Sequence, residues 1–489
     1  MLNNIVRRYS ECFQGGALVL LGLVTFWPSL GFDFVNLDDP AYVEHNELIK
    51  DWSLTNLNGI CTDVVTRNYA PLTIFTFLID HSCWGMNPCG YHATNILLHL
   101  VNGVLAFLLL RRLTGNLFVS WLSAGLFLIH PVQIESVVWI SSRKGLLASM
   151  FMLWALLVRL RPEPEAKHDI WYMFLLFAAL MAKAHAVVLP PIVLLYDVLV
   201  RRESAAMSLP RQVIPGLQAL IVLLLTMGAQ NTVLGGVRQH MSLSLLHIAA
   251  VDVTILWQYI CMLFWPTNLC VMYDPPTSGI WTQVLAGSIS WAVVIYGLWQ
   301  IRNTHRLWIL GACCFLLLLF PMLNFFRITT LMNDRYLYLP SIIVFAMFTS
   351  VVHRGVCIAE LYAGTVLRIA SAAVKPGFTV TTLAVCLALT VSHASVWRDS
   401  LSLWTHALTE YPEMPVLRIQ MAHTLYDRGD VRGAIRVMSH ALVECRTDEL
   451  DRERMLRILG EWQEKHPQPQ YVTEPLNLSQ SEHSHLAEN

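Results

Sequence analysis

Charged residues are scarce in this chain, and their signs nearly cancel. Only 14% of its 489 residues are Asp, Glu, Lys or Arg, whereas 55% are hydrophobic and the mean hydropathy is +0.50. Soluble globular domains average about 25% charged residues. The formal net charge of −1 supplies no positive field that would attract nucleic acid. The composition therefore excludes an ordinary soluble protein, gives no support for nucleic-acid binding and indicates a polytopic membrane protein.

Two kinds of short motif are also missing. The eleven cysteines are scattered and form no CxxC pair, which argues against the usual cysteine metal sites and redox motifs. The first apolar segment has no clear small-residue cleavage site after it, so we interpret it as a signal anchor and not as a cleavable signal peptide.

What the chain has in abundance is long apolar segments. A helix needs about 20 such residues to cross the hydrocarbon core. We therefore predict an all-α polytopic membrane bundle over residues 1–394, with about eleven spans, at 14–31, 91–110, 117–130, 145–160, 170–186, 187–200, 211–229, 284–301, 306–323, 337–353 and 377–394. Segment 245–266 contains three polar residues, His247, Asp252 and Gln258, and is interpreted as a re-entrant or interfacial helix.

Basic residues in the short loops predict the orientation of this bundle. Lys and Arg collect on one side of the spans, and the positive-inside rule makes that side cytoplasmic. The basic sites are Arg7, Arg8, Arg111, Arg112, Arg159, Arg161, Arg201, Arg202, Arg302, Arg306, Arg354 and the stretch 368–375. The N-terminus is then cytoplasmic, and the loops 32–90, 131–144, 230–283 and 324–336 share the opposite face.

The composition changes after about residue 395 to charged and amphipathic. Ala407-Leu408 recurs as Ala441-Leu442, and Gly429-Asp430 lies where a helix-turn-helix repeat needs its turn. We predict a short tetratricopeptide-like (TPR-like) helical domain at 395–466 on the non-cytoplasmic side, packed against the membrane domain. Two unrelated amphipathic helices are the alternative. A disordered tail is predicted at 467–489 because it has few apolar residues.

An acidic cluster follows the first span. Asp33, Asp38 and Asp39 lie within seven residues, in a protein where carboxylates near the bilayer are costly. Asp38 and Asp39 are therefore candidates for a catalytic base or for acids that hold a divalent cation such as Mg²⁺ or Mn²⁺. The structural alternative is a helix start, because Pro40 follows the pair and suits the first helical position.

The second non-cytoplasmic loop carries charges of both signs. Glu135 is a candidate second acid, and His130 lies five residues before it. Arg143-Lys144 suits a lipid-linked phosphate, Arg through a bidentate fork and Lys as a point charge. The competing interpretation of Arg143-Lys144 is an anchor for lipid headgroups.

Further polar residues lie within or beside the apolar segments. One helical face carries His92, Asn95 and His99, for which neutral hydrogen bonding is favoured over metal ligation. Lys183 and His185 lie deep in the fifth span and need partners if they are charged. Arg335 either pairs with Asp334 at the interface or holds a phosphate. The candidates for substrate or phosphate binding are therefore Arg143, Lys144, His92, His130, Arg335 and Lys183.

Several motifs, taken in their order along the chain, resemble those of the transmembrane and tetratricopeptide-repeat-containing (TMTC-like) family of GT-C polytopic glycosyltransferases. The resemblance covers about 35–465. The motifs are Leu37-Asp-Asp-Pro-Ala-Tyr42 with Asn46, Tyr69-Ala-Pro-Leu72, Tyr91-His92 with Asn95 and His99, His130-Pro131 with Glu135, Trp139 and Arg143-Lys144, Asp334-Arg-Tyr-Leu-Tyr-Leu-Pro340, and Trp397-Arg-Asp-Ser400 with Leu403-Trp404.

The resemblance implies transfer of a sugar from a polyprenyl-phosphate carrier to a hydroxyl of a protein or glycan on the non-cytoplasmic face. It implies Asp38 or Asp39 as base or metal-binding acid, and Glu135 as a second acid. Two features depart from the family pattern. Lys183-Ala184-His185 stands where the family usually has Lys-Glu, and the repeat region is short.

Two other functions compete with a glycosyltransferase. A non-catalytic scaffold would recruit partners through the TPR-like domain. A transporter is disfavoured because only Lys183 and His185 lie deep in the spans. The short chain favours a bacterial inner membrane over the endoplasmic reticulum, with the active face periplasmic or lumenal.

Overall fold

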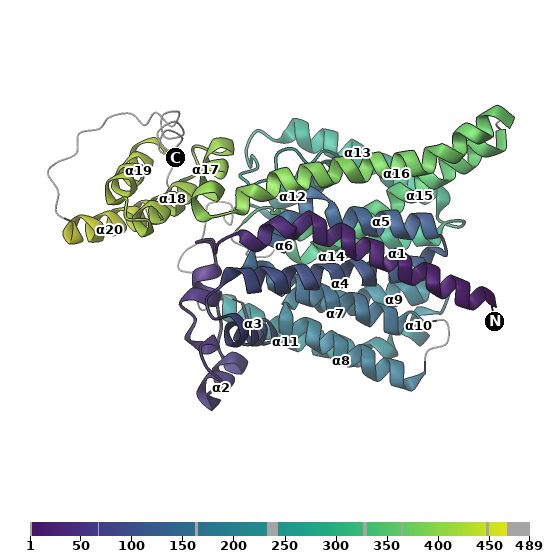
Figure 1. The fold of residues 1–489 in the computed structure, drawn as a ribbon, viewed down its shortest axis with the longest axis horizontal. Helices are drawn as coiled ribbons and strands as arrows, with labels where there is room; N and C mark the ends of the chain where they lie inside the picture. The colour runs from purple at the N-terminus through teal and green to yellow at the C-terminus, as the bar shows by residue number, and fades with distance from the viewer. Residues whose placement is uncertain are drawn as a thin grey trace.

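The protein is a bundle of helices. The computed structural model describes residues 2–66, 68–161, 165–231, 243–325, 330–362, 365–445 and 449–466. Of these described residues, 82% are helical and none lies in a strand. The predicted all-α class is confirmed (Figure 1).

The α-helices are α1 Leu2–Phe26, α2 Leu54–Thr62, α3 Pro71–Trp84, α4 Pro88–Thr114, α5 Leu117–Ile129, α6 Ile134–Val138, α7 Arg143–Arg159, α8 Ala166–Ala182, α9 Leu189–Leu199, α10 Ala205–Ser208, α11 Val213–Asn231, α12 Leu245–Phe264, α13 Trp281–Ile301, α14 Arg306–Leu319, α15 Tyr338–Tyr362, α16 Thr365–Ala394, α17 Ser400–Glu410, α18 Pro415–Asp427, α19 Val431–Glu444 and α20 Glu449–Lys465.

The predicted number of eleven spans is not confirmed. Within the described residues, eight helices are long and apolar enough to cross a membrane, or nine if α5 and the segment Pro131–Val138, bent by 55°, form one span. The segments predicted at 187–200 and 306–323 form shorter apolar helices, Ala184–Leu199 and Arg306–Met322. A helix of 17 residues, such as α8, rises roughly 25 Å, which is less than the ~30 Å hydrocarbon core.

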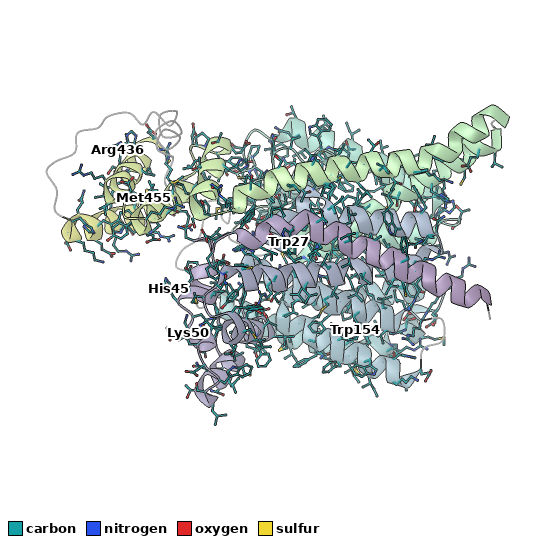
Figure 2. The ribbon with its side chains drawn as sticks, in the orientation of Figure 1. Trp27, His45, Lys50, Trp154, Arg436 and Met455 are labelled. Carbon is teal, nitrogen blue, oxygen red and sulfur yellow. The ribbon has the colours of Figure 1, made fainter. Side chains whose placement is uncertain are left out.

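The outer surface of the bundle is apolar. Trp27 and Trp154 lie on it with exposed fractions of 60% and 46%, whereas His45 and Lys50 lie at the end that carries α2 and α3 (Figure 2). Large exposed apolar side chains continue along α13, for example Val293 and Ile295. Such a surface is stable in lipid and not in water, so the chain is an integral multi-pass membrane protein.

The interpretation of segment 245–266 as a re-entrant or interfacial helix stays a prediction. α12 is long enough to span, but its first turn lies beside the first turn of α13, where the rings of His247 and Trp281 are 6.2 Å apart. Both helices therefore begin at the same end of the bundle, and the segment 265–280 runs back without a helix.

The C-terminal helices α17–α20 pack against the same end as α2 and α3 (Figure 1). The predicted turn at Gly429-Asp430 separates α18 from α19, with Gly429 at φ +87°, a backbone conformation that favours glycine. Asp430 caps α19 by accepting the Gly433 amide. The domain boundary at 395 and the TPR-like class stay predictions, and the predicted tail 467–489 lies outside the described residues.

Asn36 joins these helices to the acidic loop. Its side-chain amide donates to the Thr424 hydroxyl at 2.9 Å and to the Gln420 carbonyl at 3.3 Å, and its side-chain oxygen accepts from the Trp404 indole. Its backbone N–H donates to the Ser400 hydroxyl at 2.9 Å. The C-terminal helices therefore hold the chain three residues before Asp39.

Replacing Asn36 with Ala should loosen this loop. The change removes three side-chain hydrogen bonds and leaves the Trp404 indole without its partner, a cost of about 1–3 kcal/mol. We expect faster hydrogen exchange in residues 33–44, measured by mass spectrometry. Asn68→Ala, which removes contacts only to Thr66, is the matched control. Unchanged exchange at 33–44 in Asn36→Ala would show that the C-terminal helices do not position the loop.

Candidate active site

Asp39 is an anchor of the acidic loop. It is 1% exposed and accepts three hydrogen bonds, from the Val35 amide at 3.0 Å, the Ser141 amide at 3.0 Å and the Ser141 hydroxyl. Asp39 does precede a helical turn, Pro40–Glu44, but its side chain does not cap that turn. The structural alternative of a helix cap therefore does not describe what its carboxylate does.

Asp38 faces the other way. Its side chain is 31% exposed, and its Oδ2 lies 3.5 Å from the Lys144 Nζ. Lys144 is also 3.4 Å from the Tyr42 hydroxyl and lies 4.7 Å from the centre of the Tyr42 ring. Asp38 therefore has a long ion pair and partial access to solvent, whereas both oxygens of Asp39 are engaged by protein donors.

Burial raises the pKa of the Asp39 carboxyl from 3.8 to about 7, although the hydrogen bonds from Ser141 and Val35 act in the opposite direction. The folded state then keeps the proton to a higher pH than the unfolded state does. The contribution of Asp39 to stability is therefore complete below its unfolded pKa and is lost as the pH rises through about 7.

The stability difference between the wild type and Asp39→Asn tests this titration. Asn stays neutral at every pH, so the advantage of the wild type should shrink as the pH is raised from about 5 to about 8. The measurement is the apparent Tm of the purified protein at each pH. Asp33→Asn, at an exposed position, should show no such trend. An advantage that grows with pH would contradict the raised pKa.

Arg143 is buried in a network of its own. It is 0% exposed, with one guanidinium nitrogen 2.5 Å from Asp80 Oδ2 and two others donating at 2.8 Å to Asn95 Oδ1 and the Tyr91 carbonyl. The guanidinium also lies 4.3 Å from the centre of the Phe77 ring. Its nitrogens are therefore occupied by protein groups, and it does not line the pocket described below.

Glu135 and Arg335, both predicted site residues, form an ion pair. Glu135 Oε2 accepts the Arg335 backbone amide at 2.7 Å, and its other oxygen accepts from the Arg335 guanidinium. Arg335 also donates to Asn333 Oδ1 at 3.1 Å and lies over the Trp139 ring at 5.1 Å. Glu135 is 1% exposed, so the geometry makes it a positioning group for Arg335.

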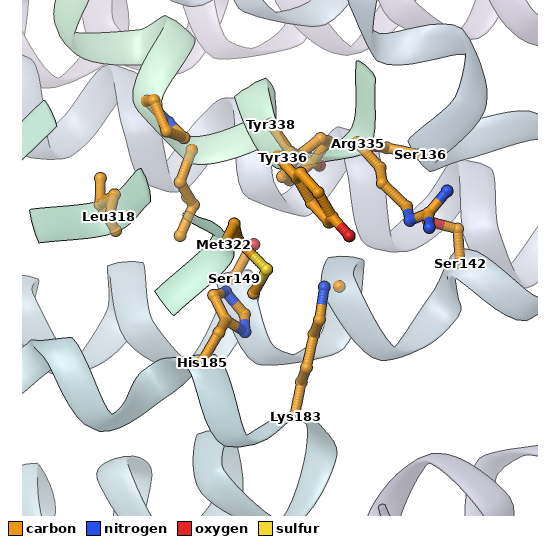
Figure 3. A pocket seen from close by; sticks show the side chains of 13 residues that line it. Ser136, Ser142, Ser149, Lys183, His185, Leu318, Met322, Arg335, Tyr336 and Tyr338 are labelled. Atoms are coloured by element: carbon orange, nitrogen blue, oxygen red, sulfur yellow. The ribbon is translucent and has the colours of Figure 1, made fainter. Parts of the chain in front are cut away.

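A small polar pocket lies behind these charges. Its cavity volume is about 30 Å³. Lys183 and His185 enter it from one wall, and Arg335 and Tyr336 from the opposite wall (Figure 3). Lys183 forms no ion pair with any described residue, and the charges that act on it electrostatically include Lys144, Arg335 and Glu135. The lining residues are Ser136, Ser142, Gly145, Ser149, Lys183, His185, Leu318, Met322, Arg335, Tyr336, Tyr338, Leu339 and Pro340.

The segment 141–145 connects the acids to this pocket. Ser141 binds Asp39, Ser142 and Gly145 line the pocket, and Lys144 pairs with Asp38. A short helical turn, Ile140–Ser142, leads directly into α7 and turns these neighbours in different directions. One stretch of chain therefore contacts both acids and also lines the pocket.

The two histidines among the candidates lie outside the pocket. His130 has one ring nitrogen 3.1 Å from the Leu263 carbonyl, and the other accepts the Val132 amide at 3.3 Å. His92 is buried edge-on against Phe32, with ring centres 6.4 Å apart. His99 bonds to the Tyr338 hydroxyl at 2.8 Å, which agrees with the neutral hydrogen bonding favoured for this face.

The acids do not match a metal site made by the protein alone. Across the described ranges, no three His, Cys, Asp or Glu side chains converge. Both oxygens of Asp39 accept protein hydrogen bonds, and the Lys144 ammonium lies beside Asp38. A cation bound here would meet that positive charge directly, so the mechanism below contains no metal step.

Comparison of the sequence with known proteins finds relatives that share a name and a family. The chain is 23% identical over 445 residues to protein O-mannosyl-transferase F38B6.6 of Caenorhabditis elegans, which covers 85% of this chain and 60% of that protein. It is 28% identical over 196 residues to protein O-mannosyl-transferase TMTC3 of Homo sapiens, 37% of this chain and 21% of that protein. The chain is a homologue of the TMTC-like proteins. It spans about 60% of the length of the nematode relative, and no family model matches it.

A solved structure is similar in a weaker sense. ArnT from Cupriavidus metallidurans, in a crystal structure bound to undecaprenyl phosphate, aligns with a TM-score of 0.41 and 13% sequence identity, over 92% of this chain and 88% of that chain.

Sequence reasoning missed several residues of the site. Ser141 and Asp80 hold Asp39 and Arg143, and Tyr336 lines the pocket opposite Lys183. Asn36, which joins the acidic loop to the C-terminal helices, directly precedes the Leu37–Tyr42 motif and was not among the predicted residues. Ser, Tyr and Asn side chains are uncharged. No local signal in the sequence therefore distinguishes Ser141, Tyr336 and Asn36 from the other Ser, Tyr and Asn residues of the chain.

Proposed function

We propose that the chain is a glycosyltransferase that moves a sugar from a polyprenyl-phosphate carrier to a hydroxyl group. The observation that carries the proposal is the polar pocket, where the unpaired Lys183 and the positioned Arg335 lie behind a partly exposed Asp38. An unpaired cation buried in a membrane protein is costly without an anionic partner. A lipid phosphate is an anion that reaches this depth from the bilayer.

Asp38 serves as the general base in this proposal. It takes the proton from the acceptor hydroxyl, whose oxygen attacks the anomeric carbon of the sugar. The bond between that carbon and the phosphate oxygen breaks, and the polyprenyl phosphate leaves with the bonding electrons. Lys183 and Arg335 stabilise the charge on the departing phosphate. Glu135 orients Arg335, and Asp39 holds the loop.

The relatives' names favour mannose as the sugar and a protein hydroxyl as the acceptor. The C-terminal helices, proposed as a TPR-like unit, adjoin the acidic loop through Asn36 and are suited to present such an acceptor. The basic loops around α1, α4 and α14 favour the non-cytoplasmic face for the acidic loop, because basic loops collect on the cytoplasmic side. A scaffold that recruits partners needs none of the charges in the pocket, so the scaffold alternative leaves Lys183 unexplained.

Replacing Lys183 with Met tests the phosphate site. Loss of a charged hydrogen bond of about 1.5–3 kcal/mol should weaken the binding of polyprenyl phosphate roughly tenfold to a hundredfold. The measurement is the Kd of polyprenyl phosphate for the purified protein. Folding should survive, because the change removes a buried charge and keeps the volume.

Lys167→Met is the matched control, since Lys167 is 65% exposed and pairs only with Glu165. It should bind the carrier as the wild type does. Equal affinities of Lys183→Met and the wild type would contradict the phosphate site.

A further inference from the structure

A second cavity lies at the opposite end of the bundle. It is an open cleft with a volume of about 570 Å³ between α4, α7 and α9 on one side and α14 and α15 on the other. It extends along α15 from Arg354 to Leu339, roughly 22 Å of helix. That depth exceeds half of the ~30 Å hydrocarbon core, so the cleft can take a whole acyl chain of one leaflet.

The mouth of this cleft is positively charged. Arg202, Arg306 and Arg354 line it together with His305 and His353, and none of its lining residues is Asp or Glu. The side chain of Arg306 reaches the Leu199 carbonyl at 3.3 Å, and that of Arg354 reaches the His305 ring at 3.0 Å. In the part of the chain that the structure describes, none of the three arginines has an acidic partner.

A carboxylate close to this region pairs with the neighbouring Arg201 and not with the arginines of the cleft. Arg201 pairs with Asp197 at 3.2 Å and does not line the cleft, whereas Arg202 beside it does. Arg202 adopts φ +60°, a left-handed conformation that is uncommon outside glycine and carries strain for a long side chain. The fold therefore keeps Arg202 in a strained backbone conformation at the position where its cationic side chain lines the cleft.

The walls behind the arginines are apolar. Leu110, Leu153, Ile192 and Ile343 are among them, and the deepest members, Leu318 and Leu339, also line the polar pocket at the other end. A positively charged mouth above an apolar interior matches an amphiphile with an anionic head. A second apolar groove of about 670 Å³, between α12, α13, α14 and α15, has no charged residue in its lining, so it points to no headgroup.

We propose that this cleft is a binding site for an anionic phospholipid of the leaflet at the N-terminal end. The phosphate would contact Arg306 and Arg354, with Arg202 at the rim, and an acyl chain would fill the space between α7 and α15. Basic residues that served only as general headgroup anchors would face the open bilayer, whereas these three line one cavity. The bound lipid would support Leu318 and Leu339 beneath the polar pocket.

The test compares two lipids on the purified full chain in detergent, counted by native mass spectrometry. Dioleoyl phosphatidylglycerol should bind at least tenfold more tightly than dioleoyl phosphatidylcholine, because only the former has a net negative charge. Equal binding of the two lipids by the wild type would overturn the proposal without any variant.

Two variants separate the head from the tail. Arg306→Gln with Arg354→Gln should lower phosphatidylglycerol binding about tenfold, whereas Arg302→Gln with Lys167→Gln, which removes the same charge outside the cleft, should not. Ala346→Trp fills the cleft, keeps all the arginines and should also lower binding. Unchanged binding in either cleft variant, or displacement of phosphatidylglycerol by polyprenyl phosphate, would contradict a dedicated phospholipid site.

Discussion

Replacing Asp38 with Asn should abolish sugar transfer without lowering the amount of folded protein. The variant keeps the size of the side chain and removes the basic oxygen, and loss of a general base typically costs 10²–10⁴-fold in rate. Stability should change little, because Asp38 is partly exposed and its ion pair with Lys144 is 3.5 Å long. The measurement is the rate of transfer from a polyprenyl-phosphate-linked sugar in reconstituted membranes.

Asp33→Asn is the matched control for that experiment. Asp33 belongs to the same acidic cluster and is exposed. Its backbone amide donates to the Arg398 carbonyl at 2.9 Å, and the substitution keeps this contact. Its rate should equal that of the wild type. Full activity in Asp38→Asn would contradict the role of Asp38 as the general base.

The largest loss of stability is expected from Arg143→Met. The change leaves Asp80 in a buried site without its guanidinium, and breaking such a buried pair costs about 3–5 kcal/mol. The double variant Arg143→Met with Asp80→Leu should recover most of the loss, since both charges are then gone. The apparent Tm of the purified variants measures both effects.

The neighbouring residue provides the control. Lys144→Met removes a cation whose partner, Asp38, is partly solvated, so it should lower transfer more than stability. If Arg143→Met instead kept its stability and lost affinity for the polyprenyl phosphate, Arg143 would be a phosphate ligand, as the sequence suggested, and not a support for the site.

Local patterns in the sequence predicted the features that depend on neighbours along the chain. The apolar segments gave the membrane helices, and Gly429-Asp430 gave the turn between α18 and α19, because a left-handed glycine and an Asp cap act over a few residues. The number of spans was not recoverable in the same way. Helices such as Arg306–Met322 are apolar but shorter than the helices that can cross a membrane. Only their packing in the folded protein shows what role they have.

The partners of the charged residues could not be predicted, because they lie far apart in the chain. Glu135 looked like an available acid, yet Arg335, 200 residues later, occupies both of its oxygens. Asp38 and Asp39 are equivalent as sequence, and only Ser141, 102 residues away, makes one of them an anchor. The sequence predicted which side chains carry the charge, and the tertiary contacts distinguish reactive groups from supporting ones.

The most direct test of the proposed site is a structure of the Asp38→Asn variant bound to a polyprenyl-phosphate-linked sugar. We expect the phosphate in the polar pocket, with an oxygen within hydrogen-bonding distance of the Lys183 Nζ, and the anomeric carbon of the sugar facing residue 38. A phosphate bound away from Lys183, with the sugar out of reach of residue 38, would contradict the proposed mechanism.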